Sequence, residues 1–158
     1  MSAIKIEGKS PISGIVKLSG NKNAILPMIA AAMLCDEEIT LCNVPDILDV
    51  RSMLEIFAAL GGKFEFQNNI LSLSAASANT AVIPRELCSK NRTSILYAAP
   101  LLVRFGKATV YPPGGDVIGR RRLDGHIYGL KTLGSTLNSE EAPAAASDVP
   151  SAQTTAAS

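Results

Sequence analysis

Two segments of the chain carry side chains that could bind an anion, and the first is the sequence Ser19-Gly20-Asn21-Lys22-Asn23. An apolar helix is predicted to begin there, and the unpaired N–H groups and dipole of a helix start favour a negative charge. Lys22 would add a mobile point charge suited to a phosphate. A capped helix start with an exposed lysine would explain the same residues, so both interpretations stay open. Arg92 opens the equivalent helix in the second half of the chain and is compatible with either one.

The second segment is Pro112-Pro-Gly-Gly-Asp-Val-Ile-Gly-Arg-Arg-Arg122. It places one carboxylate, Asp116, beside three arginines, and a guanidinium can hold a phosphate or carboxylate through two parallel hydrogen bonds. The alternative is a Pro-Gly-Gly turn followed by a solvated basic stretch. Three adjacent arginines cannot all face one ligand, so we expect one or two of them to be exposed or structural.

Other reactive side chains are few. His126, the single histidine, lies inside a predicted helix, where a structural role is favoured. The sequence has an odd number of cysteines, Cys35, Cys42 and Cys88, and none has C-x-x-C spacing. Each lies in or beside an apolar stretch, which predicts buried free thiols. The sequence contains no Walker loop, zinc spacing, nucleophile elbow or dinucleotide fingerprint.

Composition narrows the class of protein further. Of 158 residues, 47% are hydrophobic and 18% are charged, which predicts a folded core. The formal net charge of +1 gives no long-range field that would attract nucleic acid or an anionic membrane. No apolar run reaches the roughly 18 residues that a membrane span needs, and the first residues do not resemble a signal peptide. We therefore expect a cytoplasmic protein with no nucleic-acid or membrane partner.

The apolar residues recur every second position in some segments, as in strands, and about every 3.6 positions in others, as in helices. This alternation along the chain is typical of an α/β protein. We predict strands at residues 15–18, 38–42, 63–66, 70–73, 80–83 and 107–111, and helices at 24–34, 50–60, 93–103 and 123–133. They form a strand-helix-strand-helix-hairpin repeat that is complete at about 14–74 and incomplete at about 80–138. The loop before the last helix is longer than its counterpart in the first copy, which makes it the first place to look for chemistry. Residues 139–158 contain one large apolar residue, Val149, and are predicted to be a disordered low-complexity tail.

Several short motifs then occur together in a recognisable order: Ser19-Gly-Asn-Lys-Asn-Ala24, Asn43-Val-Pro45, Leu60-Gly-Gly62, Pro113-Gly-Gly-Asp-Val-Ile-Gly119 and Arg122-Leu-Asp-Gly-His126. In order and spacing they resemble the UDP-N-acetylglucosamine enolpyruvyl transferase family over about residues 4–137. The Lys22-Asn23 pair separates this family from its shikimate-pathway relative, which has a Lys-Ser motif. The resemblance implies an incomplete inside-out α/β barrel domain that uses no metal or organic cofactor. Its reaction transfers the enolpyruvyl group of phosphoenolpyruvate to the 3-hydroxyl of UDP-N-acetylglucosamine, the first committed step of peptidoglycan synthesis.

The resemblance also implies roles for individual residues. Lys22 and Asn23 would bind phosphoenolpyruvate, and Arg92 would bind the sugar nucleotide. Arg121 would contact phosphate, and the sugar-nucleotide site would be lined by Arg121, Arg122, Leu123, Asp124 and Gly125. Asp116 would be the general acid where most members have cysteine. Because a carboxylate is not a thiolate nucleophile, the resemblance predicts no covalent substrate adduct and resistance to fosfomycin.

Two departures from the family pattern stand out. Arg122 and Gly125 replace the proline and bulkier residue more usual at those positions. In addition, family members have two domains of three repeats each, and the sugar-activating aspartate and a late arginine have no counterpart in this sequence. We expect the isolated chain to be inactive. The alternative is a non-catalytic sugar-nucleotide-binding or interaction module, and an incomplete repeat would favour self-association or pairing with a complementary fragment.

Overall fold

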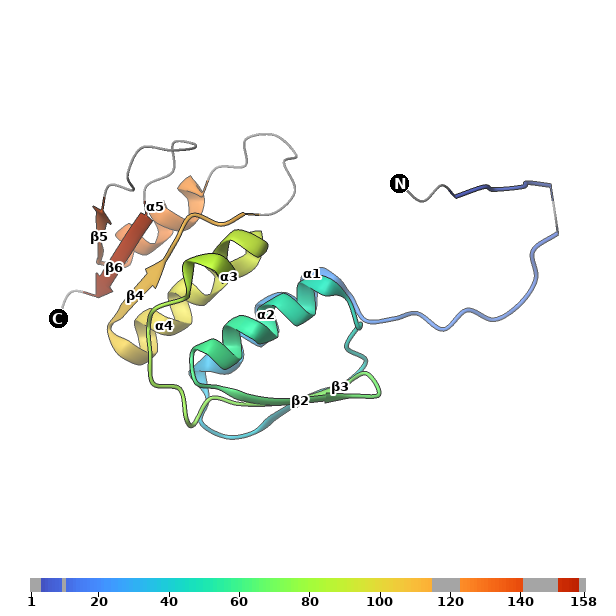
Figure 1. Ribbon diagram of the computed structural model, residues 1–158, viewed down its shortest axis with the longest axis horizontal. Coiled ribbons are helices and arrows are strands. Elements are labelled where there is room, and N and C mark those ends of the chain that lie inside the picture. The colour runs from blue at the N-terminus through green and yellow to red at the C-terminus, as the bar shows by residue number, and fades with distance from the viewer. Residues whose placement is uncertain (1–3, 10, 115–122, 141–150, 157–158) are drawn as a thin grey trace.

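The computed structural model describes residues 4–9, 11–114, 123–140 and 151–156, and its helices lie between two small sheets (Figure 1). The first repeat contributes α1 (Lys22–Ala31), the 3₁₀ turn η1 (Ala32–Leu34), β1 (Ile39–Leu41), α2 (Leu48–Ala59), β2 (Lys63–Gln67) and β3 (Ile70–Ser74). The second contributes α3 (Arg85–Lys90), the 3₁₀ helix η2 (Arg92–Tyr97), α4 (Ala98–Phe105), β4 (Lys107–Val110), α5 (Asp124–Thr132), β5 (Ser135–Glu140) and β6 (Ser151–Ala156).

The first sheet has the antiparallel order β1-β3-β2. Asn68 and Asn69 connect β2 to β3 with φ values of 51° and 62°, the left-handed conformation that a two-residue hairpin turn requires and that asparagine tolerates. Along β3, Leu71 and Leu73 are buried while their neighbours are less covered. This alternation turns one face of the sheet toward α1 and α2.

The second sheet has the antiparallel order β4-β6-β5. On the other edge of β4, Thr109 forms an isolated parallel bridge with Val82. Helix α4 packs against β4 on one side and against η1 of the first repeat on the other. The second repeat is thereby attached to the first through its helices.

One hydrophobic core runs through both repeats. Its largest fully buried side chains include Phe57 and Met53 from α2, together with Tyr97 and Leu101 from the second repeat. The Tyr97 hydroxyl donates to the carbonyl oxygen of Met53 at 2.8 Å. Burial raises the pKa of Tyr97 well above its usual value, so this phenol is a neutral part of the core.

Most of the elements predicted from the sequence are present, including both helices of the first repeat and its hairpin. The helix predicted at 93–103 is instead divided between η2 and α4, which meet at Tyr97 and Ala98. The preceding α3 was not predicted, and it is separated from η2 by Asn91, whose backbone is extended at φ −143° and ψ 125°. Of the strand predicted at 80–83, only the bridge at Val82 forms.

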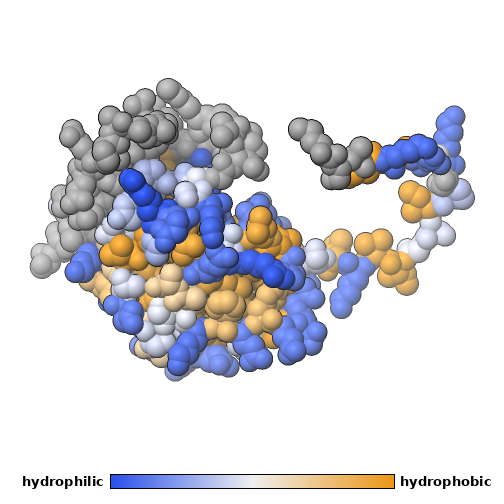
Figure 2. All heavy atoms as spheres, in the orientation of Figure 1, coloured by the Kyte–Doolittle hydropathy of each residue, from blue (hydrophilic) through white to orange (hydrophobic). Residues whose placement is uncertain are grey.

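The strand predicted at residues 15–18 does not form. Residues 4–9 and 11–19, here called the N-terminal arm, run without regular structure away from the helices (Figure 1). Apolar residues of the arm such as Ile12, Ile15, Val16 and Leu18 are more than four-fifths exposed, and orange spheres mark such residues in Figure 2. A strand needs a neighbour that completes its hydrogen bonds, and no described strand pairs with the arm.

The predicted disordered tail also differs from the structure where it is described. Residues 139–140 belong to β5, and residues 151–156 form β6, which pairs with both β4 and β5. The rest of the tail lies outside the described residues. Backbone hydrogen bonds to two neighbouring strands order residues 151–156, although the low apolar content of this segment predicted disorder.

The described part of the chain contains no helix that is long and apolar enough to cross a membrane. Of the three thiols, Cys88 is buried as predicted, Cys35 is half-buried and Cys42 is exposed, contrary to prediction. Burial raises the pKa of the Cys88 thiol.

Candidate functional site

The Lys-Asn motif lies at the start of α1, and local contacts fix it there. Asn21 is the N-cap residue, and its Oδ1 accepts a hydrogen bond from the backbone N–H of Asn23 at 2.7 Å. Gly20 lies against the backbone of the loop after β1, because a Cβ at this position would be 1.9 Å from the carbonyl oxygen of Asn43. A glycine before the cap is therefore what allows the two segments to approach so closely.

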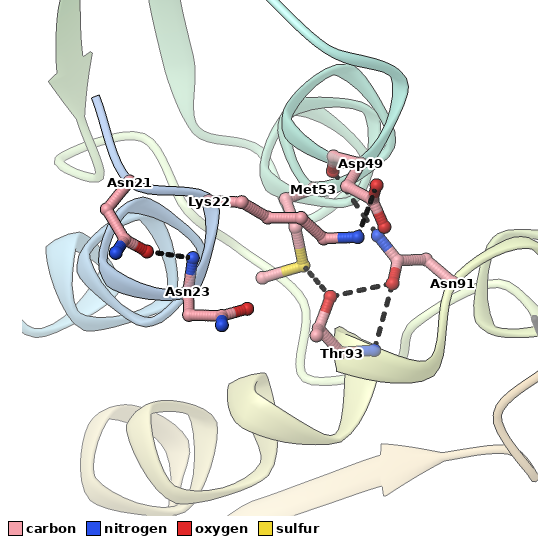
Figure 3. A network of polar contacts seen from close by, with 7 residues as sticks. All are labelled: Asn21, Lys22, Asn23, Asp49, Met53, Asn91 and Thr93. Atoms are coloured by element: carbon pink, nitrogen blue, oxygen red, sulfur yellow. Dashed lines mark hydrogen bonds and ion pairs between the residues drawn. The ribbon is translucent and has the colours of Figure 1, made fainter. Parts of the chain in front are cut away.

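Lys22 reaches from the first residue of α1 to the first turn of α2. Its Nζ lies 2.7 Å from Oδ2 of Asp49 (Figure 3). The two side chains keep 50% and 38% of their surface exposed, so the ion pair faces solvent. An anion arriving from solvent can thus reach the ammonium group.

Asn91 connects the same turn of α2 to the start of η2. Its Oδ1 accepts from the backbone N–H of Thr93 at 2.9 Å, and its Nδ2 donates to the carbonyl oxygen of Asp49 at 3.3 Å (Figure 3). The Thr93 hydroxyl lies 2.7 Å from Asn91 Oδ1 and 3.3 Å from Sδ of Met53, and its single proton serves one of these at a time. Asn91 is 4% exposed, so this small network is the buried support beneath the exposed ion pair.

Arg92 is the first residue of η2, directly between Asn91 and Thr93, and it is half-buried. The structure therefore brings together the segments that carry three of the predicted site residues, Lys22, Asn23 and Arg92, although they lie about 70 positions apart in the chain. We call the set Lys22, Asp49, Asn91, Arg92 and Thr93 the anion corner.

The loop predicted to carry the general acid starts close to this corner. The backbone N–H of Gly114 donates to the carbonyl oxygen of Cys88 at 3.0 Å, and a Cβ at Gly114 would be 1.6 Å from the carbonyl oxygen of Ser89. The guanidinium of Arg85 lies over the ring of Tyr111, 5.2 Å from its centroid. The loop thus leaves from the surface of α3, which ends at Lys90, next to Asn91.

The remaining predicted site residues are placed as follows. Asp116, Arg121 and Arg122 lie outside the described residues. Leu123 is the half-buried residue before α5, and Asp124 and Gly125 are exposed in its first turn. The network of Figure 3 does not include this turn, and the contacts of helix α5 are with β5.

Asp49, Asn91 and Thr93 were missed as site residues by sequence reasoning. The available signals were an acidic residue in the first turn of a helix and an Asn-x-Thr pattern that caps one. Both patterns also occur at ordinary helix starts. Only the contact between the two segments in the structure distinguishes these residues from ordinary capping residues.

Other polar and hollow features lie apart from the corner. A groove of about 460 Å³ is lined by residues of α2 and the hairpin, among them Arg51, Phe64 and Phe66. Hydrogen bonding from Arg51 lowers the pKa of Asp46 at its rim. Among the described residues, no group of three or more His, Cys, Asp or Glu side chains is placed to hold a metal ion.

Comparison with known proteins identifies similar sequences and folds. Residues 6–155 match the family described as EPSP synthase (3-phosphoshikimate 1-carboxyvinyltransferase). The chain is 51% identical over 137 residues to a UDP-N-acetylglucosamine 1-carboxyvinyltransferase of Treponema denticola, covering 86% of this chain and 32% of that protein. The protein of the same name from Treponema pallidum is 52% identical over 136 residues, with 85% and 32% covered. The chain thus spans about a third of the length of these relatives.

A solved structure shares the fold. The crystal structure of the enolpyruvyl transferase NikO from Streptomyces tendae matches with a TM-score of 0.72 at 24% sequence identity, covering 91% of this chain and 30% of that one. This match confirms the predicted fold class, an incomplete α/β domain of the enolpyruvyl transferase type.

Proposed function

Because the chain belongs to the EPSP synthase family of carboxyvinyltransferases, we propose that it carries part of a site that transfers the enolpyruvyl group of phosphoenolpyruvate to the 3-hydroxyl of UDP-N-acetylglucosamine. In this reaction the sugar hydroxyl loses its proton and its oxygen bonds to carbon 2 of phosphoenolpyruvate, while the methylene carbon takes up a proton. The resulting methyl group then loses a proton as the bond between carbon 2 and the phosphate oxygen breaks, so the double bond is restored and inorganic phosphate leaves. The product would enter peptidoglycan synthesis. The observation that carries the proposal is the anion corner, where Lys22 faces solvent beside the segment of Arg92.

Each residue at the site has a proposed part. Lys22 and Asn23 bind phosphoenolpyruvate, with the helix start favouring its negative charge. Arg92 binds the sugar nucleotide, together with the stretch from Arg121 to Gly125. Asp116 protonates the methylene carbon of phosphoenolpyruvate. Since Asp116 has no thiol, we also propose that fosfomycin does not alkylate this loop, and a mass increase on Asp116 after exposure to the compound would contradict this.

We propose that the isolated chain binds substrate without turning it over. It spans about a third of the relatives, and closure of a complete cleft supplies much of the acceleration in such reactions. The exposed apolar residues of the N-terminal arm support pairing with a complementary fragment. Free thiols at all three cysteines are compatible with a cytoplasmic location, which we also propose.

The test uses the purified 158-residue chain with both substrates. We expect no release of phosphate from the chain alone, but NMR shifts at the anion corner on addition of phosphoenolpyruvate. Lys22→Ala should abolish those shifts, whereas Lys63→Ala, an exposed lysine of β2, should leave them unchanged. Co-expression with the remaining two thirds of the Treponema denticola relative should restore phosphate release. A well-folded chain that binds neither substrate would contradict the proposal.

A further inference from the structure

Lys22 is already paired with a carboxylate when no substrate is present. Its Nζ lies 2.7 Å from Oδ2 of Asp49, at the face where an anion would approach. The substrate phosphate and Asp49 are therefore competitors for one ammonium group. This observation concerns Asp49, a residue to which the proposed function assigns no part.

The position of Asp49 is fixed by more than its own helix. The buried Asn91 donates to its carbonyl oxygen at 3.3 Å, while the other end of the same amide accepts from the N–H of Thr93. The carboxylate thus projects from a turn that is tied to the start of η2. In this way the ammonium of Lys22 is directed toward the segment that carries Arg92 instead of sampling the solvent freely.

We propose that Asp49 is a positioning residue and the resting counterion of Lys22, which an incoming phosphate has to displace; this rests on the proposed function of Lys22. Both side chains are more than a third exposed, so the pair is screened by water and is weak enough to exchange. A phosphate group carries more charge than a carboxylate and can take the ammonium from it. Weaker monoanions would leave the pair closed.

The charge and the position of Asp49 have separable effects. Asp49→Asn keeps the size of the side chain and one oxygen acceptor but removes the competing charge. Asp49→Glu keeps the charge. Asp46→Asn is the matched control, because Asp46 also forms an ion pair at 2.7 Å just before α2, with Arg51 instead of Lys22.

The reactivity of Lys22 toward trinitrobenzenesulfonate, an anionic amine reagent, measures the pair directly. Labelling of Lys22 is read by peptide mass spectrometry relative to Lys63 in the same molecule. We expect Asp49→Asn to label about three-fold faster, the ratio typical of losing one exposed ion pair. Asp49→Glu and Asp46→Asn should label like the natural chain. Equal labelling in Asp49→Asn and Asp46→Asn would overturn the proposal.

Protection by phosphoenolpyruvate tests the displacement. The concentration that halves Lys22 labelling should be about three-fold lower in Asp49→Asn, because the phosphate no longer competes with a carboxylate. An unchanged or higher concentration would overturn the counterion role. If phosphoenolpyruvate protects Lys22 in no variant while the labelling difference persists, the proposed function fails and the resting pair stands.

Discussion

Arg104 in α4 donates through Nη1 to the carbonyl oxygen of Met33 in η1, 3.0 Å away. The same guanidinium donates through Nη2 to the carbonyl oxygen of Ala75 at 2.8 Å and pairs with Asp36. Its side chain is 17% exposed. One planar side chain of the second repeat thus donates to two main-chain carbonyls of the first, one in η1 and one directly after β3.

Replacing Arg104 by alanine should lower the free energy of unfolding by about 2–4 kcal/mol, because two carbonyl groups lose a charged donor. Lysine should restore only part of this loss, since it lacks the fork. Urea unfolding followed by circular dichroism measures the change. The control Arg51→Ala removes an exposed ion pair and should have little effect. Equal losses in the two alanine variants would show that the Arg104 contacts do not form.

Tyr97→Phe should cost about 1 kcal/mol at pH 8, because it removes the buried hydrogen bond to Met53. The cost should disappear at high pH. Burial raises the pKa of Tyr97 in the folded chain, so its stabilising contribution is complete below the unfolded pKa of about 10 and is lost as the pH rises further. Urea midpoints at pH 8 and pH 11 measure this convergence. Tyr128→Phe, at an exposed position, should track the natural chain at both values.

Gly114→Ala should destabilise the start of the loop, because the new Cβ would meet the carbonyl oxygen of Ser89. Overpacking of this kind costs typically 1–3 kcal/mol. Gly125→Ala is the control, since a Cβ at that position in α5 has nothing within 4 Å and alanine favours a helix. Thermal unfolding compares the two. A Gly114 variant as stable as the Gly125 variant would contradict the close contact with α3.

The three thiols should react with Ellman's reagent at different rates. Cys42 is exposed and should react first, and half-buried Cys35 should follow. Cys88 is buried, and desolvation raises the pKa of its thiol, so its reactive thiolate is scarce until the chain unfolds. Mass spectrometry of partly labelled protein gives the order. Labelling of Cys88 at the rate of Cys42 in the folded state would contradict the packing of α3.

The helices of the first repeat were predictable because their apolar spacing is a local property of the sequence. The break between α3 and η2 was not, since it depends on a hydrogen bond from Asn91 to a residue 42 positions earlier. Residues 15–18 have the β-branched and apolar composition of a strand, but strand formation needs a neighbour, and no described strand pairs with them. Asp49 was missed as a site residue for a similar reason, because its partner Lys22 lies in another helix.

Tyr97 and Leu101 of the second repeat are buried in the same core as Phe57 and Met53 of the first. The boundary that divides the sequence into two copies therefore does not divide the molecule into two folding units. Cutting the chain between β3 and α3 would open the core instead of releasing two stable halves. We expect a single cooperative unfolding transition in which the hydrogen-exchange protection of α2 and α4 is lost together. The two predicted copies are therefore expected to unfold together.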